Sequence, residues 1–246
     1  MREILDILTT NKVKEERAKK ILLELAKKGK LSYLGKGTNF VALLLKQNEN
    51  KMVVKIEKDE QCAKNAARKE AHFLSYLNKY GLGPKLYFYD EKERFLIEEF
   101  LEGDFIIDFL LKEKDPAKIR EVVLKSLWKA YKMDEIGVAH GQLHLPKRHI
   151  IITSGGPRFL DFDKGVLSKK GKNLTQLVQF LFLNPRSAVR KRVLETFNLS
   201  EDDVIPLFNL LKEYKNAKEK SHIFNAILQE VTKRLQIDVK SYLENS

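Results

Sequence analysis

The residues best suited to chemistry lie together between positions 140 and 165. This segment opens with His-Gly-Gln-Leu-His and closes with Asp-Phe-Asp-Lys-Gly, and it carries Gln142, His144, His149, Asp161 and Asp163. Carboxylate oxygens are preferred ligands of Mg²⁺, whereas an imidazole suits Mn²⁺ and softer ions better. Because polar loop residues held beside a carboxylate suit a phosphate-bearing ligand, we expect a phosphate and metal site here.

The residues between the two ends of this segment predict the element that positions them. A run rich in β-branched residues extends from Arg148 to Thr153, Ser-Gly-Gly follows at 154–156, and an apolar pattern resumes from Pro157 to Leu160. Two short strands joined by a glycine turn form a hairpin. Such a hairpin would place the polar loop before its first strand and Asp161 at the end of its second.

A lysine and a glutamate upstream are both expected in apolar surroundings. Lys55 interrupts the apolar strand pattern Met-Val-Val-Lys-Ile, and a buried ammonium requires a partner. Glu70 falls on the inner face of the helix expected after Asp59, a face marked by Ala66, Phe73, Leu74 and Leu77. We expect the two charges to pair, since each offsets the desolvation of the other. The alternative is an edge-strand lysine that extends to solvent.

A glycine turn precedes this strand. The stretch from Leu34 to Val41 reads as two strands joined at Gly35 and Gly37. Glycine permits close approach of a ligand, and backbone N–H groups of such a turn bind phosphate oxygens. The alternative is an ordinary hairpin turn.

In order and spacing, these motifs resemble those of the protein-kinase-like superfamily over residues 31 to 183. The nearest resemblance is to small atypical kinases: the RIO type, the predicted archaeal serine/threonine kinases, and the lipopolysaccharide-sugar kinases that carry Asp-Phe-Asp-Lys/Arg-Gly. The resemblance implies that Gly35 and Gly37 cover the phosphates of ATP and that the Lys55 and Glu70 pair holds them. It also implies that Asp161 binds Mg²⁺ or Mn²⁺.

The resemblance extends to the adenine site. Phe-Leu-Ile-Glu-Glu-Phe-Leu at 95–101 is similar to the kinase hinge, which implies that the Glu99 C=O and the Leu101 N–H bind the adenine edge. In that register Glu98 replaces the usual apolar gatekeeper. Phe40 stands where the family has the third glycine of its phosphate loop.

The sequence departs from the family at the catalytic positions. Gln142 stands where the family has the aspartate that orients the attacking hydroxyl, and glutamine cannot accept a proton. A general base is typically worth about 10² to 10⁴ in rate, so its loss slows phosphoryl transfer without abolishing it. His144 is a second candidate for the base, or else a structural or exposed histidine. His149 is nearest to the position where the family has its second metal ligand. The candidate metal ligands are therefore Asp161, Asp163 and His149.

We expect an α+β, two-lobed, protein-kinase-like fold. Residues 31–101 would form a five-stranded antiparallel sheet with one helix, and residues 102–246 a mostly helical lobe that contains the hairpin segment 140–165. Residues 1–30 would be an N-terminal helical extension in which Thr10-Asn11 caps a helix. A DNA-reading helix-turn-helix is the alternative for these residues.

Composition limits the partners. The chain of 246 residues has 46 Lys and Arg against 34 Asp and Glu, a net charge of +12, which favours an acidic ligand or partner. A solvated, lysine-rich surface of the thermophilic kind explains the same excess. The region after the hairpin either binds an acidic substrate or forms a solvated face, through Lys164, Lys169, Lys170, Lys172, Arg186, Arg190, Lys191 and Arg192.

The lack of a recognisable targeting signal and the single cysteine predict a cytoplasmic protein. The sequence shows neither a run of about 18 apolar residues nor a signal-peptide core at its start, which predicts no membrane span. The single cysteine, Cys62, excludes an intramolecular disulfide and a cysteine-based zinc cluster.

The leading interpretation is an ATP- and divalent-metal-dependent phosphotransferase of the atypical serine/threonine kinase type. The acceptor is a protein, a sugar or an RNA-associated molecule, and Gln142 or His144 would position it. Two alternatives stay open: a pseudokinase that acts as a nucleotide-binding scaffold, and a RIO-like RNA-associated factor. Metal-dependent ATP turnover separates the enzyme from the scaffold, and salt-sensitive RNA binding that ATP does not affect would favour the third.

Overall fold

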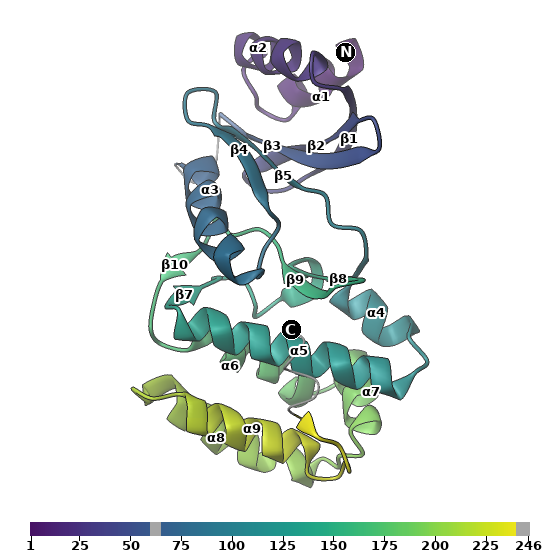
Figure 1. Ribbon diagram of the computed structural model, residues 1–246, viewed down its shortest axis with the longest axis vertical. Helices are drawn as coiled ribbons and strands as arrows, with labels where there is room; N and C mark the ends of the chain where they lie inside the picture. The colour runs from purple at the N-terminus through teal and green to yellow at the C-terminus, as the bar shows by residue number, and fades with distance from the viewer. Residues whose placement is uncertain (60–64, 240–246) are drawn as a thin grey trace. The chain divides into compact units, whose positions relative to one another are not determined.

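The computed structural model describes residues 1–59 and 65–239 and has an α+β fold (Figure 1). The chain divides into two compact units, Met1–Leu101 with Asp161–Lys164, and Glu102–Leu160 with Gly165–Ser246. Cys62 lies outside the described residues. Within those residues, every helix is too short or too polar to cross a membrane.

The first unit is built on an antiparallel sheet. Its strands follow the spatial order β1-β2-β3-β5-β4. The bounds are β1 Lys30–Lys36, β2 Phe40–Gln47, β3 Asn50–Glu57, β4 Leu86–Asp90 and β5 Phe95–Glu99. The helix α3, Ala66–Leu77, lies in the chain between β3 and β4. The five-stranded antiparallel sheet expected for this region is confirmed.

Side chains alternate between the two faces of this sheet. On β3, Val54 and Ile56 join a core with the N-terminal helices α1, Arg2–Thr10, and α2, Glu15–Ala26. Lys55 bonds to Glu70 of α3 from the opposite face. This alternation follows from the two-residue repeat of a strand. The sheet therefore has α1 and α2 on one face and α3 on the other (Figure 1).

The expectation that Thr10-Asn11 caps the start of the helix that follows it is wrong. Thr10 is the last residue of α1, and the Asn11 side-chain amide donates to the Ile7 C=O at 2.7 Å, so it satisfies the end of that helix instead. Lys12, with φ of 69°, turns the chain, and α2 begins at Glu15. Leu8, Ile21 and Leu25 are fully buried against the sheet.

The second unit is mostly helical. Its helices are α4 Ile106–Lys112, α5 Pro116–Glu135, α6 Lys172–Val178, α7 Ala188–Thr196, α8 Ile205–Asn216 and α9 Ser221–Thr232. Short strands interrupt them, namely β6 Asp104–Phe105, β7 Val138–Ala139, β8 Ile150–Thr153, β9 Gly156–Phe159 and β10 Val166–Leu167. The β6 pairing with β8 and the β7 pairing with β10 were missed, because two-residue strands carry too little periodicity to be recognised.

The expected hairpin is present in this unit. Strands β8 and β9 pair in antiparallel register with Thr153 opposite Gly156, which leaves Ser154 and Gly155 as the turn. Gly156 has φ of +97°, a conformation that glycine adopts without strain. The polar loop precedes β8, and Asp161 follows β9 after one residue. The hairpin thus lies in the chain between the polar loop and Asp161, as expected.

Candidate functional site

Lys55 is the centre of a buried charge cluster in the first unit. Its Nζ lies 3.0 Å from Glu70 Oε1, 3.2 Å from Glu98 Oε1 and 2.7 Å from Asp161 Oδ1. The side chain of Asp161 is 41% exposed, whereas those of Glu70 and Glu98 are 0% and 3% exposed. The expected ion pair between Lys55 and Glu70 is confirmed, and Asp161 faces the same ammonium.

Local geometry explains how these residues meet. Val53 and Lys55 lie on the same face of β3, and Val53 is directly opposite Glu98 of β5. Residues two apart on adjacent strands are within reach of long side chains. Glu70 lies on the buried face of α3 with Phe73 and Leu74, as its helical spacing predicts.

One ammonium among three carboxylates leaves excess negative charge. Burial alone lowers the pKa of Lys55, but Asp161, Glu70 and Glu98 outweigh it, so that this pKa lies well above its usual range. Burial raises the pKa of Glu70 and of Glu98, and Lys55 opposes the rise in both. Within the described residues, Glu70 Oε2 and Glu98 Oε2 are buried and have no hydrogen-bond partner. The cluster can therefore accept positive charge or a proton.

The glycine turn is tied to the acidic motif. Asn39, in the turn between β1 and β2, donates from its side-chain amide to the carboxylate of Asp163, and both residues are buried. A Cβ placed on Gly35 or Gly37 would meet no heavy atom of the described chain within 4 Å, so there is open space beside both glycines. Gly35 is paired with Ala42 in the sheet, and the Gly37 N–H donates to the Phe40 C=O at 2.9 Å. The Lys58 ammonium donates to the Gly37 C=O at 2.6 Å.

Asp161 has an unusual backbone. Its φ is +64°, in the left-handed region that residues other than glycine rarely occupy. Such conformations persist where the surrounding structure holds them, and they gather at functional sites. The Asp161 carboxylate, the most exposed of the three around Lys55, therefore starts from a backbone that its surroundings must hold, and it bonds to the Lys55 ammonium at 2.7 Å.

Three further residues of the first unit, Phe40, Glu99 and Leu101, were expected at the nucleotide site. Phe40 is 8% exposed, and the Lys55 ammonium lies 5.9 Å from its ring centroid, so Phe40 packs against the cluster. Glu99 ends β5, where its N–H donates to the Lys85 C=O at 2.8 Å. Leu101 is the last residue of this unit before the chain enters the second. Adenine binding at Glu99 and Leu101 stays a prediction.

The polar loop of the second unit is anchored at its first residue. The His140 N–H donates to Asn173 Oδ1 at 2.9 Å, and the His140 ring nitrogen Nε2 lies 2.7 Å from the Leu160 C=O. Asp134 in turn accepts from the N–H and the side-chain amide of Asn173 at 3.0 and 2.8 Å. His140 thus fixes the residue that directly precedes Asp161.

Burial raises the pKa of Asp134 to about 6, although hydrogen bonds from Leu174, Asn173 and Tyr214 oppose the rise. Sequence reasoning missed Asp134 and Asn173 as anchors of the loop, because neither interrupts a helical pattern. It likewise missed the bond of Asn39 to Asp163. Glu98 was expected at the gatekeeper position, but its ion pair with Lys55 was not predicted.

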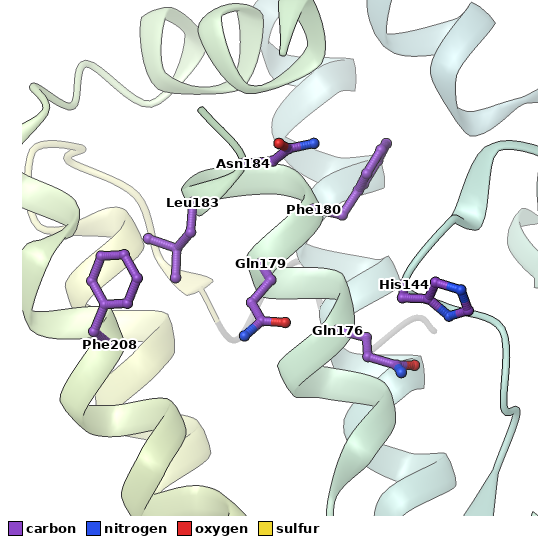
Figure 2. A pocket seen from close by; sticks show the side chains of 7 residues that line it. All are labelled: His144, Gln176, Gln179, Phe180, Leu183, Asn184 and Phe208. Atoms are coloured by element: carbon purple, nitrogen blue, oxygen red, sulfur yellow. The ribbon is translucent and has the colours of Figure 1, made fainter. Parts of the chain in front are cut away.

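His144 is exposed and lines a pocket of the second unit (Figure 2). The side chains around it come from α6, from the π-helix Gln179–Leu183 that continues α6, from the residue after that π-helix, and from α8. They are Gln176, Gln179, Phe180, Leu183, Asn184 and Phe208. A π-helix is rare and is often found at functional sites.

Gln142 is half-buried, and its C=O accepts from the Leu145 N–H at 3.1 Å.

The expected metal ligands fall in different parts of the chain. Asp161 and Asp163 belong to the first unit, and His149 belongs to the second, where its ring centroid is 5.3 Å from that of His140. Among the residues that the structure describes, no three potential ligands gather into a group that would hold a metal by themselves. Coordination by His149 stays a prediction.

The fold and the site define an α+β protein in which a buried lysine and carboxylate cluster adjoins an open glycine turn. No family model matches the chain. The chain is 31% identical over 120 residues to the uncharacterized protein MJ1211 of Methanocaldococcus jannaschii, a match that covers 48% of this chain and 97% of that protein. The chain therefore belongs to the same family as that archaeal protein.

Proposed function

We propose that this protein is an ATP- and divalent-metal-dependent phosphotransferase with the two-lobed architecture of the atypical protein kinases. The observation that carries the proposal is the Lys55 cluster. One ammonium is bonded both to a carboxylate from a helix, Glu70, and to the first carboxylate of the Asp-Phe-Asp motif, Asp161. Kinases require this combination, because the lysine holds the phosphates and the aspartate holds the metal.

The described residues fit a metal-bound nucleotide. Mg²⁺ is usually held by one or two carboxylates together with phosphate oxygens, so a cage made by the protein alone is not needed. Asp161 would supply one carboxylate, since it is partly exposed and lies beside the Lys55 ammonium. Asp163, fixed by Asn39, is the second candidate. Gly35 and Gly37 leave room for phosphate oxygens to approach, because a Cβ on either would meet no heavy atom of the described chain within 4 Å.

In the proposed reaction, the acceptor hydroxyl oxygen forms a bond to the γ-phosphorus of ATP while the bond to the bridging oxygen of ADP breaks. Asp161 and Asp163 would hold the metal, which would offset the negative charge of the phosphates. Lys55 positions them, and the hydroxyl proton passes to water or to His144. His144 lines the pocket beside α6, which gives an acceptor a place next to this imidazole.

A nucleotide-binding scaffold is the second candidate, because Gln142 cannot accept a proton.

Incubation of the protein with γ-labelled ATP, a divalent metal and cell extract tests whether the protein is a phosphotransferase. We expect labelled acceptor with wild type, none after chelation of the metal, and none with Asp161→Ala. Asp108→Ala, which changes an exposed carboxylate of α4, is the matched control. Transfer that persists in Asp161→Ala would contradict the proposal.

A further inference from the structure

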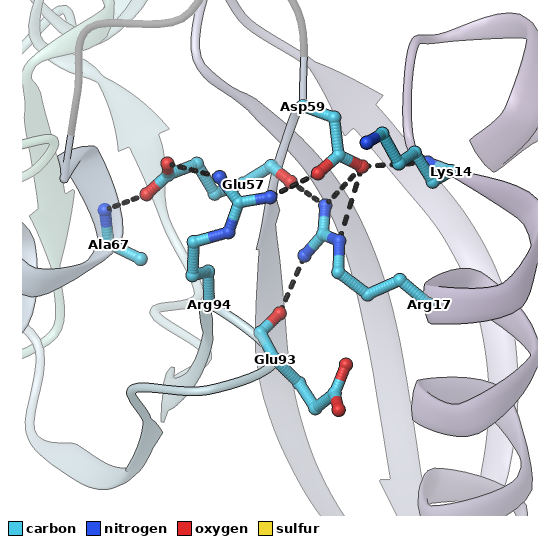
Figure 3. A network of polar contacts seen from close by, with 7 residues as sticks. All are labelled: Lys14, Arg17, Glu57, Asp59, Ala67, Glu93 and Arg94. Carbon is cyan, nitrogen blue, oxygen red and sulfur yellow. Dashed lines mark hydrogen bonds and ion pairs between the residues drawn. The ribbon is translucent and has the colours of Figure 1, made fainter.

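Arg17 of α2 joins three segments of the first unit (Figure 3). Its guanidinium donates to Asp59 Oδ2 at 3.1 and 3.2 Å, to the Glu93 C=O at 2.5 Å and to the Glu57 C=O. The Arg17 and Asp59 side chains are only 10% and 7% exposed. Charge-assisted hydrogen bonds with several acceptors are stronger and more directional than surface ion pairs. Arg17 thus fixes the end of β3.

Asp59 connects the same point to the start of α2. It accepts from the Lys14 N–H at 2.7 Å, and its own N–H donates to the Lys12 C=O at 2.7 Å. Arg94 forms a further ion pair with Asp59. Burial raises the pKa of Asp59, but the Lys14 N–H, Arg17 and Arg94 lower it more, so that it stays ionised.

Glu57 carries the connection to α3. Its carboxylate accepts from the Ala67 N–H at 2.7 Å, in the first turn of α3, and Arg94 lies 3.4 Å from the same side chain. A helix start exposes N–H groups that need acceptors, and Glu57 supplies one from β3. Ala67 is one turn before Glu70, and Glu57 is two residues after Lys55. The contacts of Glu57 and Lys55 therefore both hold α3 to β3.

We propose that α1 and α2 form a built-in device that positions Glu70 against Lys55, with Arg17 as its positioning residue. This inference rests on the proposed function, since the aligned pair is what holds the nucleotide. Loss of Arg17 would leave Asp59 and the Glu57 C=O without their shared donor, at the point from which Glu57 reaches α3. The position of α3 then becomes less fixed, and the Lys55 and Glu70 pair forms less often.

The experiment compares wild type with Arg17→Ala, Arg17→Lys and Lys19→Ala. Lys19 is the matched control, because it lies on the exposed side of α2 and its ion pair is with exposed Glu15. We expect Arg17→Ala to weaken binding of a fluorescent ATP analogue about 10-fold. Hydrogen exchange of α3 amides should become at least about 10-fold faster. Arg17→Lys should be intermediate, since an ammonium keeps the charge but lacks the planar fork.

A double-mutant cycle separates positioning from general stability. If Arg17 acts through Glu70, then Arg17→Ala should weaken nucleotide binding in wild type but not in Glu70→Gln. Equal losses in both backgrounds, or unchanged α3 exchange in Arg17→Ala, would overturn the proposal. Arg17→Lys replaces Arg17→Ala in the cycle if the alanine variant does not fold.

Hydrogen exchange is measured without nucleotide, so it tests the device separately from the activity. A wild-type protein that binds no ATP would refute the proposed function, while faster α3 exchange in Arg17→Ala would still support the structural coupling. Unchanged exchange together with normal ATP binding would refute the device alone.

Discussion

Lys55 and Glu70 form an ion pair of 3.0 Å that joins the middle of β3 to the buried face of α3. Both side chains are almost fully withdrawn from water, and Glu98 and Asp161 share the same ammonium. A lysine surrounded in this way is at once a structural centre and the group that would meet a phosphate.

Lys55→Met should destabilise the protein strongly, because it leaves Glu70 and Glu98 buried without a counter-charge. Removal of one partner of a buried ion pair costs about 3 to 5 kcal/mol of unfolding free energy. Lys55→Met combined with Glu70→Gln should recover part of that loss. Denaturant unfolding measures both, with Lys46→Met on the exposed part of β2 as the control. Similar stability of the single and double variants would contradict a coupled pair.

Glu98→Gln should stabilise the protein increasingly as the pH rises. Burial raises the folded-state pKa of Glu98, so the folded protein keeps a proton that the unfolded chain has already lost. Wild-type stability therefore falls as the pH rises from about 4.3, the ordinary glutamate pKa, towards the raised value. The variant lacks this loss, and it should gain about 1 to 2 kcal/mol above the raised pKa.

Unfolding free energies of wild type and Glu98→Gln at pH 5 and pH 8 test this expectation. Glu91→Gln is the control, since Glu91 is mostly exposed and its ion pair is with exposed Arg68. A difference between wild type and Glu98→Gln that stays constant over this range would show that Glu98 keeps an ordinary pKa.

Asp161→Ala should remove the metal-dependent part of ATP binding while leaving the metal-independent part. The reason is that its carboxylate offsets the charge of the ion that accompanies the triphosphate. Titration of the fluorescent ATP analogue with and without metal provides the measurement, and Asp108→Ala should behave as wild type. Equal metal dependence in Asp161→Ala and wild type would exclude Asp161 as a ligand.

Activity should favour Mn²⁺ over Mg²⁺ if His149 completes the site, because an imidazole is a poor ligand for Mg²⁺. Transfer rates at saturating levels of each ion, in wild type and His149→Ala, test this expectation. The preference should disappear in the variant. Equal rates with both ions in wild type would argue against His149 as a ligand.

The strand-like apolar pattern was sufficient to predict the sheet and the burial of Lys55, and the helical period was sufficient to place Glu70 on the buried face of α3. Both signals are local. The contact of Glu98 with Lys55 depends on the order of the strands in the sheet, and that of Asn39 with Asp163 joins residues 124 positions apart in the chain. No local sequence pattern reveals either contact. The start of α2 was misplaced because Asn11 satisfies the end of α1, and an Asn suits either role.

Gln142→Asp distinguishes an enzyme from a scaffold. If the acceptor hydroxyl docks beside residue 142, a carboxylate there restores a base and should raise transfer by up to about 10²-fold. A scaffold that never binds an acceptor would show unchanged ATP affinity and no transfer in either form. The measurement is phosphate transfer at saturating ATP by wild type, Gln142→Asp and His144→Ala side by side.

His144→Ala indicates which residue handles the proton. A loss of transfer in this variant, with ATP affinity intact, would assign the base to His144 and the acceptor to the pocket that His144 lines. Gln179→Ala, which alters the same pocket at an exposed amide, should then weaken acceptor binding while leaving the rate at saturating acceptor near that of wild type. If wild type and Gln142→Asp both fail to transfer phosphate to a true acceptor, the protein is not a phosphotransferase.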